Sequence, residues 1–273
     1  MLWGTEMTDV DRLTRKPTGR VVGLDGCAGG WFAVWADPDT EDLEHELYDD
    51  LAEVFSVHGE ADRLLVDIPI GVTNDGPRVC DKAAREMLGI RGVSVFPAPC
   101  RAVVEYRQAT DDAASYERAN RLQREFLDSG ISQQAWNITD KIATMDASLQ
   151  ETAESRSADV FESHPECCFA TLNSGYPIAH SKSNQTGRAA RFAVLDAELE
   201  GWKECYETAC KKYYYSEVAR DDIIDAMVLV AAGRHPLESI PETPTADDNG
   251  LVMQIVVPQH TPAWDGLLSA AEL

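Results

Sequence analysis

Basic side chains are scarce in this chain of 273 residues, and lysine is the scarcest of them. Asp and Glu number 47 against 24 Lys and Arg, which gives a formal net charge of −23 and a sequence pI near 4.5. Only seven of the 24 cations are lysine. Such a surface repels nucleic acid on average. The composition is typical of a halophilic protein, because the short Debye length of molar salt, about 3 Å, screens repulsion among carboxylates. An ordinary acidic protein is the alternative.

The chain also lacks long apolar runs and paired cysteines. Its longest apolar stretches, 223–233 and 251–258, fall short of the roughly 20 residues that span a bilayer, so we expect no membrane association. Residues 1–18 have no signal-peptide pattern and are expected to be a disordered leader. The seven cysteines form no C-x-x-C pair, and their odd number favours a reducing cytoplasm.

Several familiar catalytic and phosphate-binding motifs are absent. There is no G-x-x-x-x-G-K-[ST], no G-x-G-x-x-G and no G-x-S-x-G, so P-loop, Rossmann and serine-hydrolase sites are unsupported. No cysteine has a neighbouring base in the sequence. The 44% hydrophobic and 26% charged content excludes disordered and fibrous classes. The length suits one large domain, or one domain that carries a long insertion.

The apolar pattern that is present predicts an α/β domain over residues 19–235. Its opening strands are expected at 20–25, 31–36 and 45–48, followed by a helix that ends at Gly59 and a buried strand at 63–70. A largely helical insertion follows at about 73–157, before a further strand at 158–163. A final buried helix is expected at 219–233. Residues 236–273 are expected to form a linker, at 236–248, and a tail whose residues 252–257 could add an edge strand.

Aspartates end two of the predicted central strands and lie within the final helix. Asp25 follows VVGL and Asp67 follows LLV; each could simply cap the turn after its strand. Asp222 lies in the first turn of the final helix, where a carboxylate complements the helix dipole. Asp225 lies deeper, among apolar residues, where an unpaired carboxylate costs several kcal/mol. A metal ion or an arginine partner is therefore expected at Asp225.

Further carboxylates follow the strand at 158–163. Glu162 ends that strand, and Glu166 follows in the HPE turn beside His164. Carboxylates gathered from strand ends and a buried helix make an oxygen-rich site suited to Mg²⁺ or Mn²⁺. Two such ions would clamp the attacking and leaving oxygens of a phosphodiester. His164 has a simpler alternative role as a helix cap.

Cations are concentrated in one segment, 78–107. It holds six cations against three carboxylates, which makes it a basic island in a strongly acidic chain. Arginine geometry suits bidentate phosphate contacts. Pairing with neighbouring carboxylates is the alternative explanation. The six cations are Arg78, Lys82, Arg85, Arg91, Arg101 and Arg107.

An ordered set of motifs resembles a known family. The motifs are GLDGCAGGW, VDIPIGV, RVCDKAAREMLGIRGVSVFPAPCR, ISQQAWNITDKI, ESHPECCF and DDIIDA. They resemble domain-of-unknown-function family 429, a family of predicted RNase H-like nucleases, over about Val21 to Gly233. The resemblance implies an RNase H-like core, a mixed sheet flanked by helices with the helical insertion between its fourth and fifth strands.

The same resemblance assigns residue roles. It implies metal-binding carboxylates at Asp25, Asp67 and Asp222 or Asp225, with Glu162 and Glu166 in the acidic HPE motif. The family's basic positions fall on Arg78, Arg85, Arg91, Arg101 and Lys141.

Three functions remain open at this point. The favoured one is a nuclease-like phosphodiester hydrolase that uses Mg²⁺ or Mn²⁺ and acts on nucleic acid or nucleotides. A non-catalytic nucleic-acid or nucleotide binding module is the second. An actin-like or sugar-kinase-type phosphotransferase is the third, although such enzymes need a duplicated core, for which 273 residues are barely enough.

Overall fold

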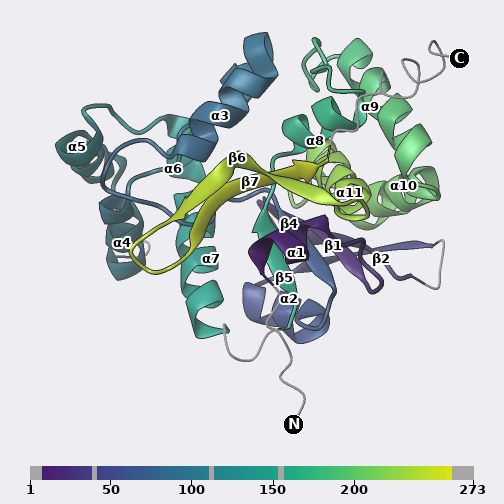
Figure 1. Cartoon of the computed structure of the whole chain (residues 1–273), viewed down its shortest axis with the longest axis horizontal. Helices are drawn as coiled ribbons and strands as arrows, with labels where there is room; N and C mark the ends of the chain where they lie inside the picture. The colour runs from purple at the N-terminus through teal and green to yellow at the C-terminus, as the bar shows by residue number, and fades with distance from the viewer. Residues whose placement is uncertain (1–7, 39–41, 111–113, 153–156, 260–273) are drawn as a thin grey trace, which may run out of the picture.

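The computed structural model describes residues 8–38, 42–110, 114–152 and 157–259. Their centre is a five-stranded mixed sheet in the order β3-β2-β1-β4-β5, flanked by helices (Figure 1). Strand β1 pairs antiparallel with β2 and parallel with β4, and β4 pairs parallel with β5. The mixed α/β class expected from the sequence is thus confirmed. The strands are β1 (Val21–Cys27), β2 (Gly30–Ala36), β3 (Leu43–Tyr48), β4 (Arg63–Val66) and β5 (Asp159–Glu162).

Helices cover both faces of this sheet. Helix α11 (Arg220–Gly233) lies against one face, and all but its first turn is buried, as its apolar sequence predicts. The other face packs against α2 (Leu51–His58) and α7 (Thr139–Glu151) through side chains such as Leu64, Val66 and Ile142. The remaining helices after β5 are α8 (Pro165–Leu172), α9 (Gln185–Glu198) and α10 (Trp202–Lys212).

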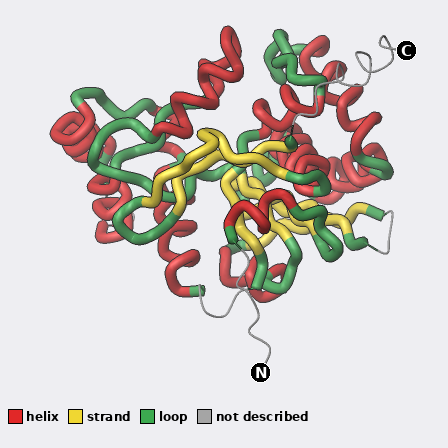
Figure 2. The backbone as a smooth tube through the Cα atoms, viewed as in Figure 1, coloured by secondary structure: helices red, strands yellow, loops and turns green. Residues whose placement is uncertain are grey.

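The described chain between β4 and β5 contains helices and no named strand. In Figure 2 it forms the helical lobe on the left, and α8 to α11 form the lobe on the right; the first helix of the left lobe packs against α8. Among the described residues, every helix is too short or too polar to cross a membrane. The elements of the left lobe are α3 (Val79–Leu88), the 3-10 helix η1 (Gly89–Ser94), α4 (Arg101–Thr110), α5 (Tyr116–Leu127), α6 (Gln133–Asn137) and α7.

The expected linker forms a strand instead. Strand β6 (Leu237–Ala246) and β7 (Val252–Pro258) make an antiparallel hairpin that crosses between the two lobes (Figure 2). The prolines of β6 are tolerated because they fall at a shift in register between Ile240 and Thr245. The expected edge strand at 252–257 therefore pairs with β6, and one isolated bridge from Val256 to Ser163 ties it to the end of β5.

The expected disordered leader is also ordered where the structure describes it. Residues 8–18 contain helix α1 (Asp9–Thr14), which a Thr8–Asp11 capping box begins. The fully buried guanidinium of Arg63 donates hydrogen bonds to carbonyl oxygens of α1 and the residues that follow it. Residues 1–7 of the leader and 260–273 of the tail lie outside the described residues.

Candidate metal centre

Strand register brings Asp25 and Asp67 side by side. Leu24 of β1 is the partner of Val66 of β4 in a parallel pairing, and the backbone N–H of Asp67 donates to the carbonyl of Leu24 at 3.0 Å. Residues in register on neighbouring strands point to the same face of a sheet. Gly23 and Leu65, two positions earlier, both contact α11. Asp25 and Asp67 therefore face that helix as well.

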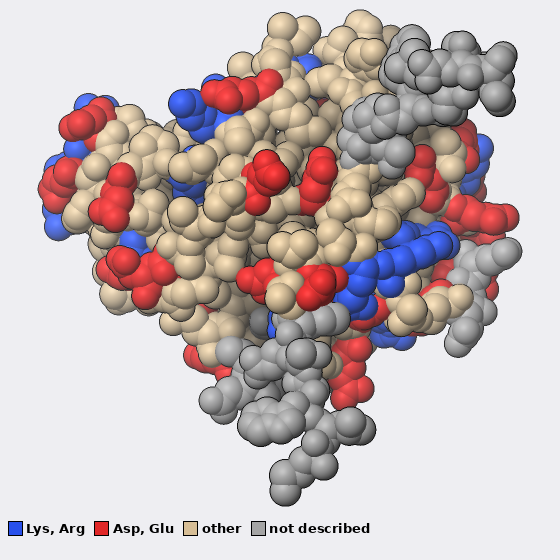
Figure 3. Space-filling model, viewed as in Figure 1, with Lys and Arg blue, Asp and Glu red and all other residues tan. Residues whose placement is uncertain are grey.

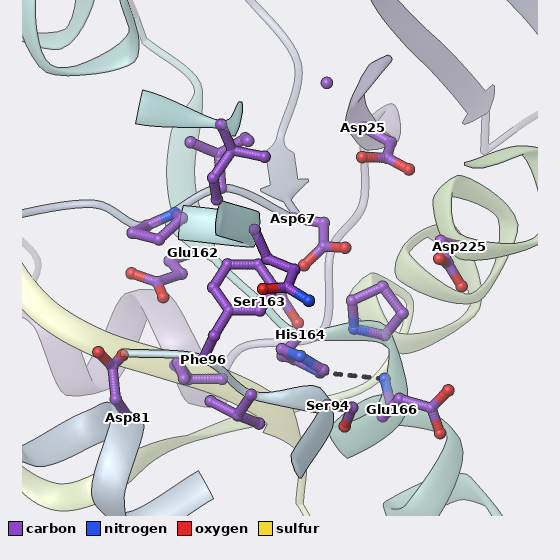
Figure 4. A pocket seen from close by; sticks show the side chains of 18 of the residues that line it. Asp25, Asp67, Asp81, Ser94, Phe96, Glu162, Ser163, His164, Glu166 and Asp225 are labelled. Atoms are coloured by element: carbon purple, nitrogen blue, oxygen red, sulfur yellow. Dashed lines mark hydrogen bonds between the residues drawn. The ribbon is translucent and has the colours of Figure 1, made fainter. Parts of the chain in front are cut away.

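A glycine on β1 allows α11 to approach closely enough to add a third carboxylate. A Cβ atom at Gly23 would lie 2.1 Å from the carbonyl oxygen of Ala226, so only glycine fits there. Asp225, the residue before Ala226, is thereby held over the end of β1. Oxygen atoms of Asp25, Asp67 and Asp225 all lie within 4.8 Å of one another. Figure 4 shows the three carboxylates around one space, as the sequence predicted.

Lys182 is the cation that the sequence did not identify. Its ammonium donates to Oδ2 of Asp225 at 2.6 Å and lies 3.2 Å from Oδ2 of Asp221. The expected partner of Asp225 was a metal ion or an arginine, and the described residues supply a lysine from the loop before α9. Nothing in the local sequence of Lys182 separates it from an ordinary surface lysine, so only the fold identifies it.

Burial and mutual repulsion perturb all of the acids in this centre. Burial, then the charge of Asp67, raises the pKa of Asp25 well above its usual range. Burial, then Asp225, raises the pKa of Asp67 to about 8. Burial raises the pKa of Asp225, although Lys182 opposes this. Asp25 and Asp67 therefore tend to bind protons near neutral pH when no metal is present, and a divalent cation that displaces those protons would neutralise the carboxylates in their place.

The donor atoms fit a hard divalent ion. All three are carboxylate oxygens, and oxygens bound to one Mg²⁺ or Ca²⁺ ion at about 2.0–2.6 Å can be no more than about 5 Å apart. The observed limit of 4.8 Å meets that condition. Asp25, Asp67 and Asp225 are therefore the residues that could hold Mg²⁺ or Mn²⁺.

Two carboxylates expected in the centre lie outside it. Asp222 accepts a hydrogen bond from the backbone N–H of Ala219 at 2.8 Å and caps α11. Burial raises its pKa to about 6, but it is not one of the three clustered carboxylates. Glu162 is in register with Val66, whose side chain lies on the opposite face of the sheet from α11. Glu162 therefore lines the cavity beside the centre without joining the three clustered carboxylates.

Glu162 has structural partners instead. Its carboxylate accepts two hydrogen bonds from the buried guanidinium of Arg78, at 2.6 and 2.8 Å, and one from the N–H of Ile70 at 2.7 Å. Arg78 also donates to Asp81. The expected phosphate contact at Arg78 is thus replaced by a closed ion-pair network.

Most other members of the basic island are paired within the protein too. Arg101 is buried between Asp146, at 2.8 Å, and Asp247, at 2.5 Å. Arg85 donates to the carbonyl oxygen of Val95. Arg78 and Arg91 both line the cavity beside the metal centre. Arg91 differs from Arg78 and Arg101 because its side chain forms no ion pair among the described residues, and its buried Nε has no hydrogen-bond partner there. Arg78 and Arg101 thus follow the alternative of internal pairing, and Arg91 is still a candidate for binding phosphate.

Of the remaining predicted residues, Glu166 and His164 line the cavity and Lys141 does not. Glu166 lines the cavity, and the fully buried Arg191 binds both of its carboxylate oxygens, at 2.5 and 2.7 Å. His164 caps α8 by accepting the N–H of Glu166 at Nδ1, 3.2 Å away (Figure 4), and burial lowers its pKa. Lys141 donates to the carbonyl of Gly30 at 2.7 Å and packs over Trp31 rather than lining the cavity.

A cavity of about 390 Å³ opens beside the three carboxylates. Its other walls come from α3 and η1 with the residues around them, from α6 and the residue after it, from the end of β5 and the start of α8, from the loop before α9 and from β7. A site that joins apolar walls to a few charged groups is typical of small-ligand or single-base recognition. The apolar lining side chains include Ile68, Val93, Val95, Phe96, Ile138 and Ile255.

The surface outside this cavity follows the composition. Figure 3 shows acidic side chains spread over the visible face of the molecule.

Comparison with known proteins gives one match. A family model described as "Protein of unknown function (DUF429)" matches residues 23–247, which include the three clustered carboxylates and Lys182. No curated protein and no solved structure matches the chain.

Proposed function

This chain belongs to the DUF429 family of proteins of unknown function, and we propose that it is a nuclease-like phosphodiester hydrolase that depends on Mg²⁺ or Mn²⁺. The observation that carries the proposal is the cluster of Asp25, Asp67 and Asp225 within 4.8 Å, opposite a single lysine. Three closely spaced carboxylates, two of them buried and one half-buried, repel one another, so an unfilled cluster destabilises the fold. A divalent ion removes that repulsion.

The proposed fold is RNase H-like, in line with the family resemblance. Support comes from the strand order β3-β2-β1-β4-β5, with β2 antiparallel to its neighbours, and from acids on the first strand, after the fourth strand and on the last long helix. In this interpretation the helices between β4 and β5 are the insertion expected at about 73–157.

The residues of the centre have distinct proposed roles. When bound, a divalent ion polarises a phosphoryl oxygen and lowers the pKa of a coordinated water. Asp25, Asp67 and Asp225 hold and orient it. Arg91, whose Nε lacks a partner, contacts the phosphate from the cavity wall. The apolar wall that includes Phe96 accepts a base or sugar and excludes water. The substrate is accordingly nucleic acid or a nucleotide.

The other two functions find less support. The described residues contain one five-stranded sheet, whereas an actin-like phosphotransferase needs a duplicated core. A non-catalytic binding module is favoured by one observation, the Lys182–Asp225 ion pair, which neutralises part of the centre without a metal. The experiment below therefore separates cleavage from binding.

Purified protein is incubated with Mn²⁺ and with bis(p-nitrophenyl) phosphate or a labelled single-stranded oligonucleotide. Cleavage of both is expected, and Asp67→Asn is expected to abolish it. The matched control is Asp75→Asn, which changes an exposed aspartate outside the cavity. Binding without cleavage would indicate the binding module, and consumption of ATP with an intact oligonucleotide would indicate a phosphotransferase. Cleavage that survives in Asp67→Asn would refute the assignment of this centre.

A further inference from the structure

A second cavity adjoins the metal centre on the other side of Lys182. It encloses about 510 Å³ and shares Ser181 and Lys182 with the first cavity. Its walls come from the loop before α9, from α9, from α10 and the residues after it, and from the first turn of α11. We call it the cationic pocket and define it by Lys182, Arg188, Arg220, Tyr206 and Tyr215.

The charge of this pocket is opposite to that of the chain. Three cations line it against one carboxylate, Asp221, in a protein with a net charge of −23. Asp221 already pairs with Lys182. Among the described residues, Arg188 and Arg220 form no ion pair, which sets them apart from Arg78 and Arg101.

The two free guanidinium groups keep donors available. Arg188 is exposed and makes one hydrogen bond, to the carbonyl of Ser183 at 3.0 Å. Arg220 donates from one terminal nitrogen to the carbonyl of Cys210 at 2.9 Å, and its other terminal nitrogen is buried without a partner. A buried unpaired donor on a charged group is costly unless a ligand accepts its hydrogen bond. The expected ligand is an anion.

Two helices add to the positive potential. Both α9 and α11 are 14 residues long and begin at the pocket, since Arg188 lies in the first turn of α9 and Arg220 opens α11. Helix N-termini carry partial positive charge and free N–H groups that favour phosphate.

Lys182 connects this pocket to the metal centre. Its ammonium contacts Asp225, a member of the metal centre, and Asp221, which lines the cationic pocket. These two aspartates are four residues apart, about 6 Å along α11. A ligand that fills both cavities therefore needs two anionic groups close together, as consecutive phosphates of a nucleic acid provide.

Building on the proposed function, we propose that the cationic pocket binds the phosphate next to the scissile one in a single-stranded nucleic acid. Arg188 and Arg220 hold that phosphate, and Lys182 lies between the cationic pocket and the metal centre. Tyr215 is 65% exposed at the same pocket. It offers a face on which an unpaired base can stack, which a base inside a duplex cannot do. In this proposal Lys182, Arg188 and Arg220 add phosphate contacts outside the segment 78–107, from which Arg91 contributes at the first cavity.

The test compares one-phosphate and many-phosphate substrates in the full-length protein. Arg188→Ala is expected to raise the KM for a single-stranded oligonucleotide about tenfold and to reduce the slope of log affinity against log salt by about one. Hydrolysis of bis(p-nitrophenyl) phosphate, which has no second phosphate, is expected to stay unchanged. Arg121→Ala removes an exposed arginine on α5, far along the chain, and serves as the matched control.

The outcomes separate the two proposals. If Arg188→Ala leaves the oligonucleotide KM and salt slope as in Arg121→Ala, the cationic pocket is refuted while the metal centre stands. Equal losses on both substrates would also refute it, because they would indicate an effect on the centre itself. If the wild type cleaves neither substrate, the proposed function fails. Fluorescence anisotropy of the labelled strand in Ca²⁺ then tests the pocket independently, with the same tenfold loss expected.

A further arm identifies the source of the phosphate. A nucleoside triphosphate is added as a competitor for the oligonucleotide. Weak competition in the wild type, together with weaker oligonucleotide binding in Tyr215→Ala, supports a polynucleotide strand. Competition stronger than that of a short oligonucleotide would refute a strand as the ligand and indicate free nucleotides instead.

Discussion

Replacing Asp67 by Asn is expected to stabilise the protein in the absence of metal. Burial and the charge of Asp225 raise the pKa of Asp67 from 3.8 to about 8. At pH 7 the carboxyl group is therefore ionised in the unfolded chain and mostly protonated in the folded one. Folding must then take up a proton against the solution pH, which destabilises the native state. Asparagine has nearly the same shape and carries no charge. The variant therefore avoids the free-energy cost of taking up a proton on folding.

The size of the effect follows from the same pKa values. Neutral pH lies about three pH units above 3.8, and one unit corresponds to about 1.4 kcal/mol, so the upper limit is about 4 kcal/mol. Water in the open cavity screens the carboxylates and reduces the gain, which we expect to be about 1–4 kcal/mol. Because the native pKa is the higher one, the advantage of Asp67→Asn is absent below pH 4. It grows as the pH rises towards 8 and is constant above that.

Metal is expected to offset the advantage of Asp67→Asn. A ligand that binds only the folded state adds about 2.7 kcal/mol at one hundred times its Kd. Mn²⁺ should therefore stabilise the wild type and leave Asp67→Asn nearly unchanged.

Urea unfolding at pH 5, 7 and 8, in EDTA and in Mn²⁺, measures both effects, with Asp75→Asn as the control for an exposed aspartate. A metal-free Asp67→Asn that is no more stable than wild type at pH 7 would refute the electrostatic argument. Equal stabilisation of both proteins by Mn²⁺ would place the ion elsewhere.

Two further predictions concern the charges around the centre. Arg78→Met should lower the free energy of unfolding by about 3–5 kcal/mol in urea denaturation, because it leaves Asp81 and Glu162 buried without their partner; a variant as stable as wild type would contradict the structural role. If the acidic surface is a salt adaptation, the Tm should rise from low to molar KCl as repulsion is screened. A flat or falling Tm in a KCl series would argue for an ordinary acidic protein.

The carboxylate centre was predictable because its residues stand at positions that the sequence marks. Asp25 and Asp67 each follow a run of apolar residues, and the ends of neighbouring parallel strands meet at one edge of a sheet. Asp225 lies inside an apolar helix, where a charge is costly unless it has a partner. Each of these signals can be read from the neighbouring residues in the sequence, and the fold then brings the three aspartates together.

Glu162 shows where local signals fail. It also ends a strand, but its partner in register is Val66, and Ser163 occupies the position in line with Asp67. Side chains alternate between faces, so an offset of one residue moves a carboxylate to the other side of the sheet. No feature of the sequence ADVFES reveals that offset before the register of β5 against β4 is known.

The basic island shows a related limit, because counting local charges does not reveal partners that are distant in the sequence. Arg78 is neutralised in part by Glu162, 84 positions away, and Arg101 by Asp247, 146 positions away. Arg188 and Arg220 lie in segments with ordinary charge, yet they remain without ion pairs among the described residues. Phosphate recognition depends on which cations stay unpaired after folding, and the folded contacts decide that.

Lys182 is a further case in which the sequence did not identify a partner that is distant along the chain. The apolar surroundings of Asp225 required a cation there, and the requirement was visible in the sequence. The identity of the cation was not, because a loop lysine 43 positions away satisfies it. One ammonium balances the charge of one of the three clustered carboxylates. Lys182 therefore neutralises Asp225 and does not neutralise Asp25 and Asp67. Without a metal, Asp25 and Asp67 relieve their repulsion by binding protons, as their raised pKa values indicate. A divalent ion can replace those protons, which is the physical reason to expect an ion beside Lys182 rather than instead of it.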